Sequence, residues 1–401
     1  MTNHVALSDL VTAAKAVQPR TVALRRQIHR NPEQGLQLPT TQTAVLGALA
    51  DLPVRVHTGT GCSSVVALLD GERPGPTVLL RGDMDALPLH EDTGLEFASE
   101  VPDSMHACGH DTHVAMLASA ARLLAERRAE LSGRVLFMFQ PGEEGYHGAK
   151  VMIDEGLVDE HRPDRALALH ITSTLDSGVV TSRPGPIMAS SDVLRVVVTG
   201  RGGHAAMPHD ACDPVPAAAA IVGALQTMIT RRTSAMDPTV LTIAHITAGT
   251  TTNIIPETAH LEGTIRALSE ANRTLVHEEI RRVCQHVAAA YGCTAEVDIE
   301  MGYPVTINDE GVGRDVVRLA GEVLGDRYGV PMPTPMMGAE DFSYVLQRVP
   351  GAMAFVGACP PGEDPDTAPP NHSNRVVFDE DAMPHGVAVY TAFALDALGK
   401  R

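Results

Sequence analysis

Cysteine, histidine and aspartate side chains crowd into one short stretch of the chain, MHACGHDTH at residues 105–113. Cysteine thiolates and histidine imidazoles are the ligands that borderline-soft divalent cations such as zinc prefer. A structural zinc finger is disfavoured, because no second Cys/His pair lies nearby at finger spacing. The stretch therefore predicts part of a catalytic metal site that other segments complete. Its candidate side chains are His106, Cys108, His110, Asp111 and His113.

Further polar side chains follow three apolar runs that are typical of buried strands. Active sites of open α/β sheets lie at the carboxyl ends of their strands, so we expect these side chains to converge on the cysteine-histidine stretch. The runs are TVLL, RVLFMF and RALAL, and the side chains that follow them are Asp83 with Asp85, Glu143 with Glu144, and His170.

The adjacent carboxylates of Glu143 and Glu144 repel each other unless positive charge holds them. Two metal ions would supply that charge. One carboxylate could then bind metal while the other takes a proton from the attacking water.

Strands and helices alternate on both sides of these motifs, which predicts an α/β fold with a mostly parallel central sheet flanked by helices. The first helix should end before Asn31-Pro32, because the residue before a proline disfavours helix. The expected strands are 63–69, 77–80, 134–139, 165–169 and 352–358, and the expected helices are 7–29, 113–131, 312–324 and 381–398.

The pattern changes near Ser190, where the order becomes β-α-β-β-α-β. This order is typical of the ferredoxin-like unit, with helices on one face of a small antiparallel sheet. We therefore expect an inserted α+β domain at 191–301 and a discontinuous catalytic domain made of 1–190 and 302–401.

The composition excludes some partners. The formal charge of the 401 residues is −18, which disfavours nucleic acid and anionic membrane. No apolar run is long enough to span a bilayer, and the N-terminal segment does not resemble a secretory signal. The six cysteines form no C-x-x-C pair and are expected to be reduced thiols, so we expect a cytoplasmic protein.

Motifs spread from about Arg25 to Phe378 resemble the zinc-dependent aminoacylase/carboxypeptidase superfamily. The most similar branch contains hippurate hydrolase, the auxin-amino-acid conjugate hydrolases and other N-acyl-amino-acid amidohydrolases. The motifs are RGDMDALPL (81–89), MHACGHDTHVAML (105–117), QPGEEG (140–145), LH (169–170), GRGGHAAMPH (200–209), NIIP (253–256), GTIR (263–266), GAEDFS (338–343) and NHS (371–373).

The resemblance implies a metal-dependent amidohydrolase of N-acyl amino acids that binds two divalent ions. Zinc is expected, with manganese or cobalt as alternatives. Glu143 would be the general base, and Asp85 would orient a ligand. The metal ligands that the resemblance implies are Cys108, His110, Glu144, His170 and His372.

The resemblance also assigns the inserted domain as a lid and dimerisation domain, which makes a homodimer, or a tetramer, the expected assembly. His204 would stabilise the oxyanion, from its own subunit or from the partner subunit. Asn253 and Arg266 would hold the substrate, since a guanidinium can bind a carboxylate through two hydrogen bonds.

Three segments depart from the usual pattern of the family: NPEQGLQL (31–38), AGTT (248–251) and the additional His147. They leave the choice of substrate open. Dipeptide hydrolysis and N-carbamoyl amino acid hydrolysis are alternative activities, and a metal-binding or substrate-binding protein without catalysis is the non-enzymatic one. The acid at Glu143 argues against the last, and Cys108 argues against the carbamoyl hydrolases, which by resemblance use carboxylate and histidine ligands there.

Overall fold

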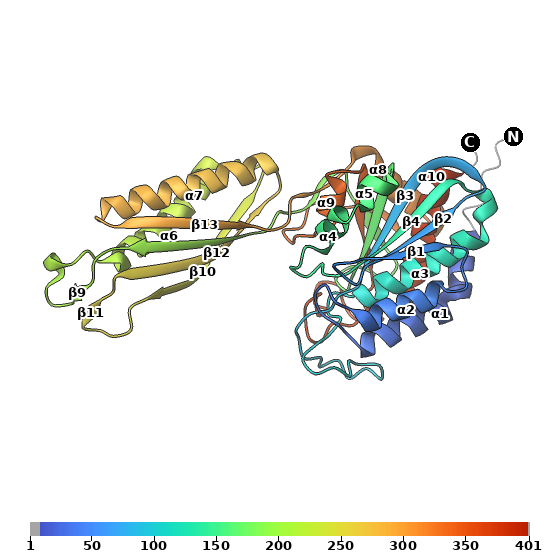
Figure 1. Cartoon of the computed structure of the whole chain (residues 1–401), viewed down its shortest axis with the longest axis horizontal. Coiled ribbons are helices and arrows are strands. Elements are labelled where there is room, and N and C mark those ends of the chain that lie inside the picture. The colour runs from blue at the N-terminus through green and yellow to red at the C-terminus, as the bar shows by residue number, and fades with distance from the viewer. Residues whose placement is uncertain (1–8, 400–401) are drawn as a thin grey trace. The chain divides into compact units, whose positions relative to one another are not determined.

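The computed structural model describes residues 9–399, and the chain divides into two compact units (Figure 1). Unit 1 contains residues 9–187, Ile307–Thr334 and 341–399. Unit 2 contains Met188–Thr306 and, in addition, Pro335–Glu340, which the sequence prediction had placed in the catalytic domain.

Unit 1 is built on a mixed eight-stranded sheet in the order β1-β2-β4-β3-β5-β16-β6-β15. The neighbours β4, β3, β5 and β16 are parallel, whereas antiparallel pairs join β1 to β2, β2 to β4 and β16 to β6. This confirms the predicted, mostly parallel central sheet. The strands are β1 (Arg55–Thr58), β2 (Val65–Asp70), β3 (Arg73–Asp83), β4 (Ser132–Gln140), β5 (Arg165–Thr172), β6 (Val180–Ser182), β15 (Gly329–Pro331) and β16 (Gly351–Gly357).

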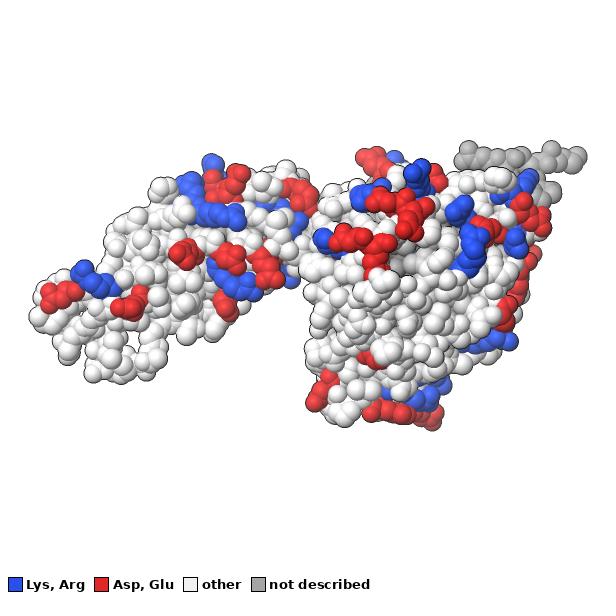
Figure 2. Space-filling view, viewed as in Figure 1, with Lys and Arg blue, Asp and Glu red and all other residues white. Residues whose placement is uncertain are grey.

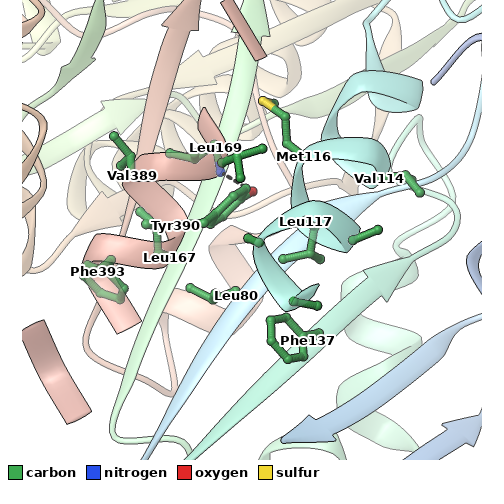
Figure 3. Close-up of a cluster of buried hydrophobic side chains, with 14 of the residues drawn as sticks. Leu80, Val114, Met116, Leu117, Phe137, Leu167, Leu169, Val389, Tyr390 and Phe393 are labelled. Atoms are coloured by element: carbon green, nitrogen blue, oxygen red, sulfur yellow. Dashed lines mark hydrogen bonds between the residues drawn. The ribbon is translucent and has the colours of Figure 1, made fainter. Parts of the chain in front are cut away.

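Helices flank this sheet, and two largely buried ones, α3 and α10, pack against its central strands. Figure 3 shows Leu117 and Phe393 on these helices facing strand side chains such as Leu167. The helices of unit 1 are α1 (Leu10–Arg30), α2 (Pro39–Leu49), α3 (His110–Glu126), α4 (Gly148–Asp154), α5 (Leu157–His161), α8 (Glu310–Leu324), α9 (Ser343–Leu346) and α10 (Met383–Leu398), with short 3-10 turns at Arg128–Glu130 and Glu380–Ala382.

A buried tyrosine ties α10 to the carboxyl ends of two strands. The Tyr390 hydroxyl donates to the Arg81 carbonyl at 2.6 Å and accepts from the Leu169 amide at 3.0 Å, the bond drawn in Figure 3. The two strands, β3 and β5, lead directly into candidate site residues. This contact therefore helps to fix the positions of those residues at the edge of the sheet.

Helix α2 was not predicted from the sequence. The helix begins with Pro39 at its first turn, a favoured position for proline, but its threonines and glycine are weak helix formers. Its buried side chains, including Val45 and Leu49, join the core of unit 1, so tertiary packing stabilises it.

The predicted first helix begins at residue 7, and its first residues lie outside the described range.

Unit 2 has the predicted ferredoxin-like order. Its sheet runs β10-β12-β8-β13 with every pair antiparallel, and alternate side chains of β8 and β12 are buried in a core shared with α6 and α7. Asp213 and Ser269 cap the two helices through their side chains. The elements are β8 (Asp192–Thr199), α6 (Pro214–Arg232), β10 (Thr239–Ala248), β12 (Thr258–Ala267), α7 (Glu270–Ala290) and β13 (Thr294–Met301).

Two small ribbons complete the fold. The strands β9 (Gly203–His204) and β11 (Ile254–Ile255) pair within unit 2, beside a 3-10 turn at Pro208–Asp210. The strands β7 (Gly185–Met188) and β14 (Thr306–Asn308) form the other ribbon.

Acidic and basic side chains lie intermingled on the face that Figure 2 shows. The net charge of −18 is therefore an excess of acids within a mixed surface rather than a field of one sign on this face. Across residues 9–399, no helix combines the length and the apolar character that a bilayer span requires.

Candidate metal centre

Cys108 lies at the centre of the cluster that the structure brings together in unit 1. Its Sγ lies 3.4 Å from Nε2 of His170, which comes from β5, and 3.3 Å from Nε2 of His372, which comes from the loop before α10. His372 Nε2 is also 3.2 Å from Oε1 of Glu144, which follows β4. Ligand candidates that are more than 250 residues apart in the sequence therefore meet at one thiol.

Two histidines of the cluster are oriented through their second ring nitrogen. Nδ1 of His110 donates to the Asp85 carbonyl at 2.8 Å, and Nδ1 of His170 donates to the Ile171 carbonyl at 2.7 Å. Metal-binding histidines are usually held in this way, because the bond fixes the tautomer and frees the other nitrogen as a ligand. Nε2 of His110 is buried and has no hydrogen-bond partner within residues 9–399.

The carboxylate of Asp85 holds the glutamate pair. Its two oxygens accept from the backbone amides of Glu143 and Glu144, each at 2.9 Å. Asp85 and Glu143 are both buried, and the Glu144 side chain is only 13% exposed. The aspartate thus fixes the loop that presents both glutamates beside His110.

The turn before α3 depends on glycine. Gly109 has φ of +87°, and a Cβ there would lie 2.4 Å from a methyl group of Ile171. This conformation lets Cys108 and His110, on either side of Gly109, both join the cluster. A second anchor is Asn371, whose side-chain amide donates to the Cys108 and Ile171 carbonyls, each at 3.0 Å.

The electrostatics of the cluster favour a cation. Contacts with Cys108 and Glu144 raise the pKa of His372 to about 10. Burial acts to lower the pKa of His110, but the charges of Asp83 and Cys108, together with hydrogen bonds to Asp85 and Cys108, outweigh burial and raise that pKa. Burial lowers the pKa of His170, which keeps that imidazole neutral, the form that binds metals. Divalent cations compete with protons for these donor atoms.

Five sets of three donor residues in the described chain could hold a metal ion, and within each set the donor atoms lie within 4.8 Å of one another. Two of these sets share Cys108. One set contains Cys108, His110 and His170, and the other contains Cys108, Glu144 and His372. A third set joins His110 to Glu143 and Glu144. The residues therefore fit a metal centre in which Cys108 belongs to both halves.

Asp83 and His113, both predicted from the sequence as candidate metal-site residues, form a donor set with His110 and also bind each other. Nδ1 of His113 donates to Oδ1 of Asp83 at 2.5 Å, and its Nε2 accepts from the Ile171 amide at 2.7 Å. Asp83 is also bound by Arg81, whose guanidinium reaches Asp341 of the GAEDFS motif at 3.2 Å. Hydrogen bonds among these buried residues hold the strand ends around the proposed ligands. The only sign of this role in the sequence is that polar residues occur within or next to apolar runs.

A second buried network lies behind the turn. Asp111 accepts from Arg25 at 2.8 Å and is 2.9 Å from Nδ1 of His29, so it ties α3 to α1. Interaction with Arg25 and His29 outweighs burial and lowers the pKa of Asp111. His106 is fully buried beside His29. Neither Asp111 nor His106 belongs to a candidate metal set of the described residues.

Three predicted site residues lie in unit 2. His204 on β9 is exposed and pairs with Ile254, and the neighbouring Ala205 amide donates to the Asn253 carbonyl at 3.1 Å. The structure thus brings His204 and Asn253 together on the β9-β11 ribbon. Arg266 lies apart from the ribbon, on β12, and its buried Nη1 has no hydrogen-bond partner in the described chain.

Comparison with known proteins gives the same family over most of the chain. The model of peptidase family M20/M25/M40 matches residues 79–396. Thermostable carboxypeptidase 2 of Saccharolobus solfataricus is 38% identical over 97% of this chain and 98% of its own length. IAA-amino acid hydrolase ILR1-like 4 of Arabidopsis thaliana is 36% identical over 93% of this chain and 84% of its own length.

Solved structures agree with these sequence matches. The crystal structure of the YXEP protein of Bacillus subtilis, described as a dinuclear metal binding peptidase from the M20 family, superposes with a TM-score of 0.83 and 31% identity. The match covers 96% of this chain and 99% of that one.

Proposed function

The chain belongs to peptidase family M20/M25/M40, and from that premise we propose that it hydrolyses the amide bond of N-acyl amino acids with two bound divalent metal ions. Cys108, His110, Glu144, His170 and His372 are the proposed ligands. The observation that carries the proposal is the position of Cys108, whose sulfur is a donor that two candidate sets share.

When bound, the metals would acidify a water molecule and polarise the amide carbonyl. Glu143, buried beside Glu144 and His110, would take the proton of the attacking water and pass it to the departing amine. Asp85 supports this role because it fixes the backbone of Glu143. The proposed metals are zinc ions, which a thiolate ligand favours, with manganese or cobalt as alternatives.

Three residues of unit 2 would complete the reaction. His204 would donate a hydrogen bond to the developing oxyanion, and Asn253 on the same ribbon would help to hold the substrate. Arg266 would bind the carboxylate of the amino acid. Its half-buried guanidinium has an unpaired Nη1, and such a donor is costly unless a ligand pairs it.

The names of relatives favour this substrate class. An IAA-amino acid hydrolase and an N-acetyldiaminopimelate deacetylase, each 36% identical, are named for acylated amino acids. A second candidate is the hydrolysis of short peptides, which the name of the carboxypeptidase relative favours. Both substrates present an amide next to a free carboxylate, so the proposed site residues serve either.

We also propose that unit 2 acts as lid and dimerisation domain of a homodimer, or of a tetramer. Its β10 is an edge strand with exposed Val240 and Ile246, a surface suited to pairing with another copy. A cytoplasmic location is part of the proposal, since all six cysteines are free thiols. Light scattering would measure the assembly directly.

The activity test is hydrolysis of a panel of N-acetyl, N-benzoyl and N-carbamoyl amino acids and dipeptides, with added Zn²⁺ or Mn²⁺ or with EDTA. The proposal predicts release of amino acid that EDTA and Glu143→Ala abolish. Preference for dipeptides would select the second candidate. A folded, metal-loaded protein that turns over nothing in the panel would contradict the proposal.

Arg266 can be tested separately with matched substrates. The best N-acyl amino acid is compared with its carboxamide, which lacks the negative charge. Arg266→Gln should lower kcat/KM for the acid by roughly 10- to 100-fold, because a charged hydrogen bond is lost, and should leave the carboxamide nearly unaffected. An equal loss on both substrates would contradict a carboxylate-binding role.

A further inference from the structure

Two cysteines of unit 2 lie in contact with each other. Sγ of Cys212 is 3.4 Å from Sγ of Cys293, although 81 positions separate them in the chain. No other pair among the six cysteines, all of which lie in the described range, makes such a contact. Neither residue belongs to the proposed metal centre or to the substrate residues.

The backbone around both thiols is anchored. Cys212 exchanges two hydrogen bonds of 2.8 Å with Arg201, and the Cys293 amide donates to the Ala288 carbonyl at 2.9 Å. Cys212 lies directly before Asp213, the cap of α6, and Cys293 lies directly before the first residue of β13. The two sulfurs therefore face each other from rigid positions within one folded unit.

The two thiols differ in access to solvent. Cys212 is half-buried, whereas Cys293 is 4% exposed. Burial, together with the neighbouring Cys212, raises the pKa of the Cys293 thiol to about 11. An oxidant in solution therefore reaches Cys212 first, and Cys293 lies behind it as the resolving thiol.

We propose that Cys212 and Cys293 form a reversible disulfide when the protein meets a peroxide. A disulfide needs a sulfur–sulfur distance of about 2.05 Å, and small rotations of two side chains already in contact would close the gap. The inference is independent of the activity proposed above.

The reaction proceeds in two balanced steps. The Cys212 thiolate attacks one oxygen of hydrogen peroxide, the O–O bond breaks, and a sulfenic acid and hydroxide form; the proton of the thiol turns that hydroxide into water. The Cys293 sulfur then attacks the sulfenic sulfur, the S–O bond breaks, and the Cys293 proton leaves with the hydroxide as a second water. A dithiol reductant would reverse the change.

The crosslink would join two connections of unit 2. It would tie the end of the 200–212 segment, which carries His204, to the turn between α7 and β13. Closing so long a loop removes conformational entropy from the unfolded chain, so a disulfide formed in the native geometry should stabilise unit 2.

The test treats the metal-loaded full-length protein with hydrogen peroxide and maps its peptides by mass spectrometry without reduction. The expected result is a 212–293 crosslink, the loss of two thiols per chain and complete reversal by dithiothreitol. The melting temperature of the oxidised protein should rise by roughly 5 °C. A 212–293 crosslink that forms only after the protein has been unfolded, and not in the native protein, would overturn the proposal.

Single variants separate the two roles. Cys293→Ser should leave Cys212 as a sulfenic acid that dimedone captures, whereas Cys212→Ser should leave Cys293 unlabelled. Cys62→Ser, which removes a buried thiol in unit 1, is the matched control and should still form the crosslink. If circular dichroism shows that Cys212→Ser or Cys293→Ser is unfolded, the corresponding alanine variant is used for the same measurement. Failure of the wild-type protein to form the 212–293 bond, with other cysteines oxidised instead, would contradict the inference.

Discussion

The proposed metal-ligand cluster of unit 1 and the β9-β11 ribbon of unit 2 are held in opposite ways. His110 and His170 are buried and fixed by hydrogen bonds to backbone carbonyls, while Asp85 fixes the glutamate pair. His204 is exposed on a two-residue strand. A set of metal donors needs a rigid scaffold to hold its atoms close together, whereas a residue that is proposed to meet the substrate needs open space in front of it. Substitutions should therefore have different consequences in the two regions.

The largest effect is expected at Glu143. Glu143→Gln keeps the shape of the side chain and removes the proton acceptor, so kcat should fall by about 10²- to 10⁴-fold. Metal content should stay the same, because Glu143 is not among the proposed ligands. Rate measurements beside elemental analysis check both points. A variant that loses its metal together with its activity would show that Glu143 is a ligand.

The corresponding change in unit 2 is His204→Asn, which should lower kcat by roughly 10²- to 10³-fold, the usual cost of removing one oxyanion donor. Because the side chain is exposed, the melting temperature should not change. His286→Asn, at an exposed position on α7, serves as the control and should behave like the wild type. If the wild type, His204→Asn and His286→Asn all had the same kcat, His204 would have no role in the reaction.

Support around the ligands can be tested at Asp85. Asp85→Asn replaces one of the oxygens that accept the Glu143 and Glu144 amides, and it removes a buried charge next to His110. Metal affinity should fall by about 10- to 100-fold in a competition titration with a chelating dye. Asp92→Asn, which affects an exposed pair with Arg375, should have no measurable effect. Unchanged affinity in Asp85→Asn would contradict the supporting role.

A buried ion cluster in unit 2 predicts a pH dependence of stability. Asp192 accepts from Arg273 at 2.5 Å and is 2.7 Å from Nε2 of His277. Burial opposes ionisation, but these hydrogen bonds outweigh it and lower the pKa of Asp192 from 3.8 to about 2. The carboxylate therefore stabilises the fold above about pH 4, and this contribution, about 2 kcal/mol, is lost as the pH falls toward 2.

Urea unfolding followed by hydrogen exchange of β8 and α7 peptides would measure this loss between pH 5 and 2.5. In Asp192→Asn the contribution of this group should be absent at every pH. A wild-type protein whose unit 2 keeps constant stability over that range would contradict the assignment.

Sequence periodicity predicted most elements because the buried strands and amphipathic helices follow their expected spacings. It predicted the ferredoxin-like order of unit 2 and the parallel strands of unit 1, but not α2, whose stability comes from packing. Short strands such as β9, β11 and β15 were also missed, since two or three residues carry no measurable period.

The candidate site was predictable to a different extent in each unit. The Cys108 motif and the strand-end carboxylates point to metal chemistry by residue type alone, whereas the roles of His204, Asn253 and Arg266 came only from resemblance. The supporting contacts of Asn371, Asp83 and His113 could not be predicted from the sequence, because a hydrogen bond between residues far apart in the chain leaves no pattern in it.

Metal stoichiometry is the decisive measurement for this protein, because the proposed centre requires two ions that share Cys108. Purified protein reconstituted with zinc and desalted would be analysed for metal per chain, beside Cys108→Ala. The account predicts two ions per chain in the wild-type protein and at most one, weakly held, in the variant. A wild-type protein with a single ion, or a Cys108→Ala variant that keeps two tightly bound ions, would contradict it.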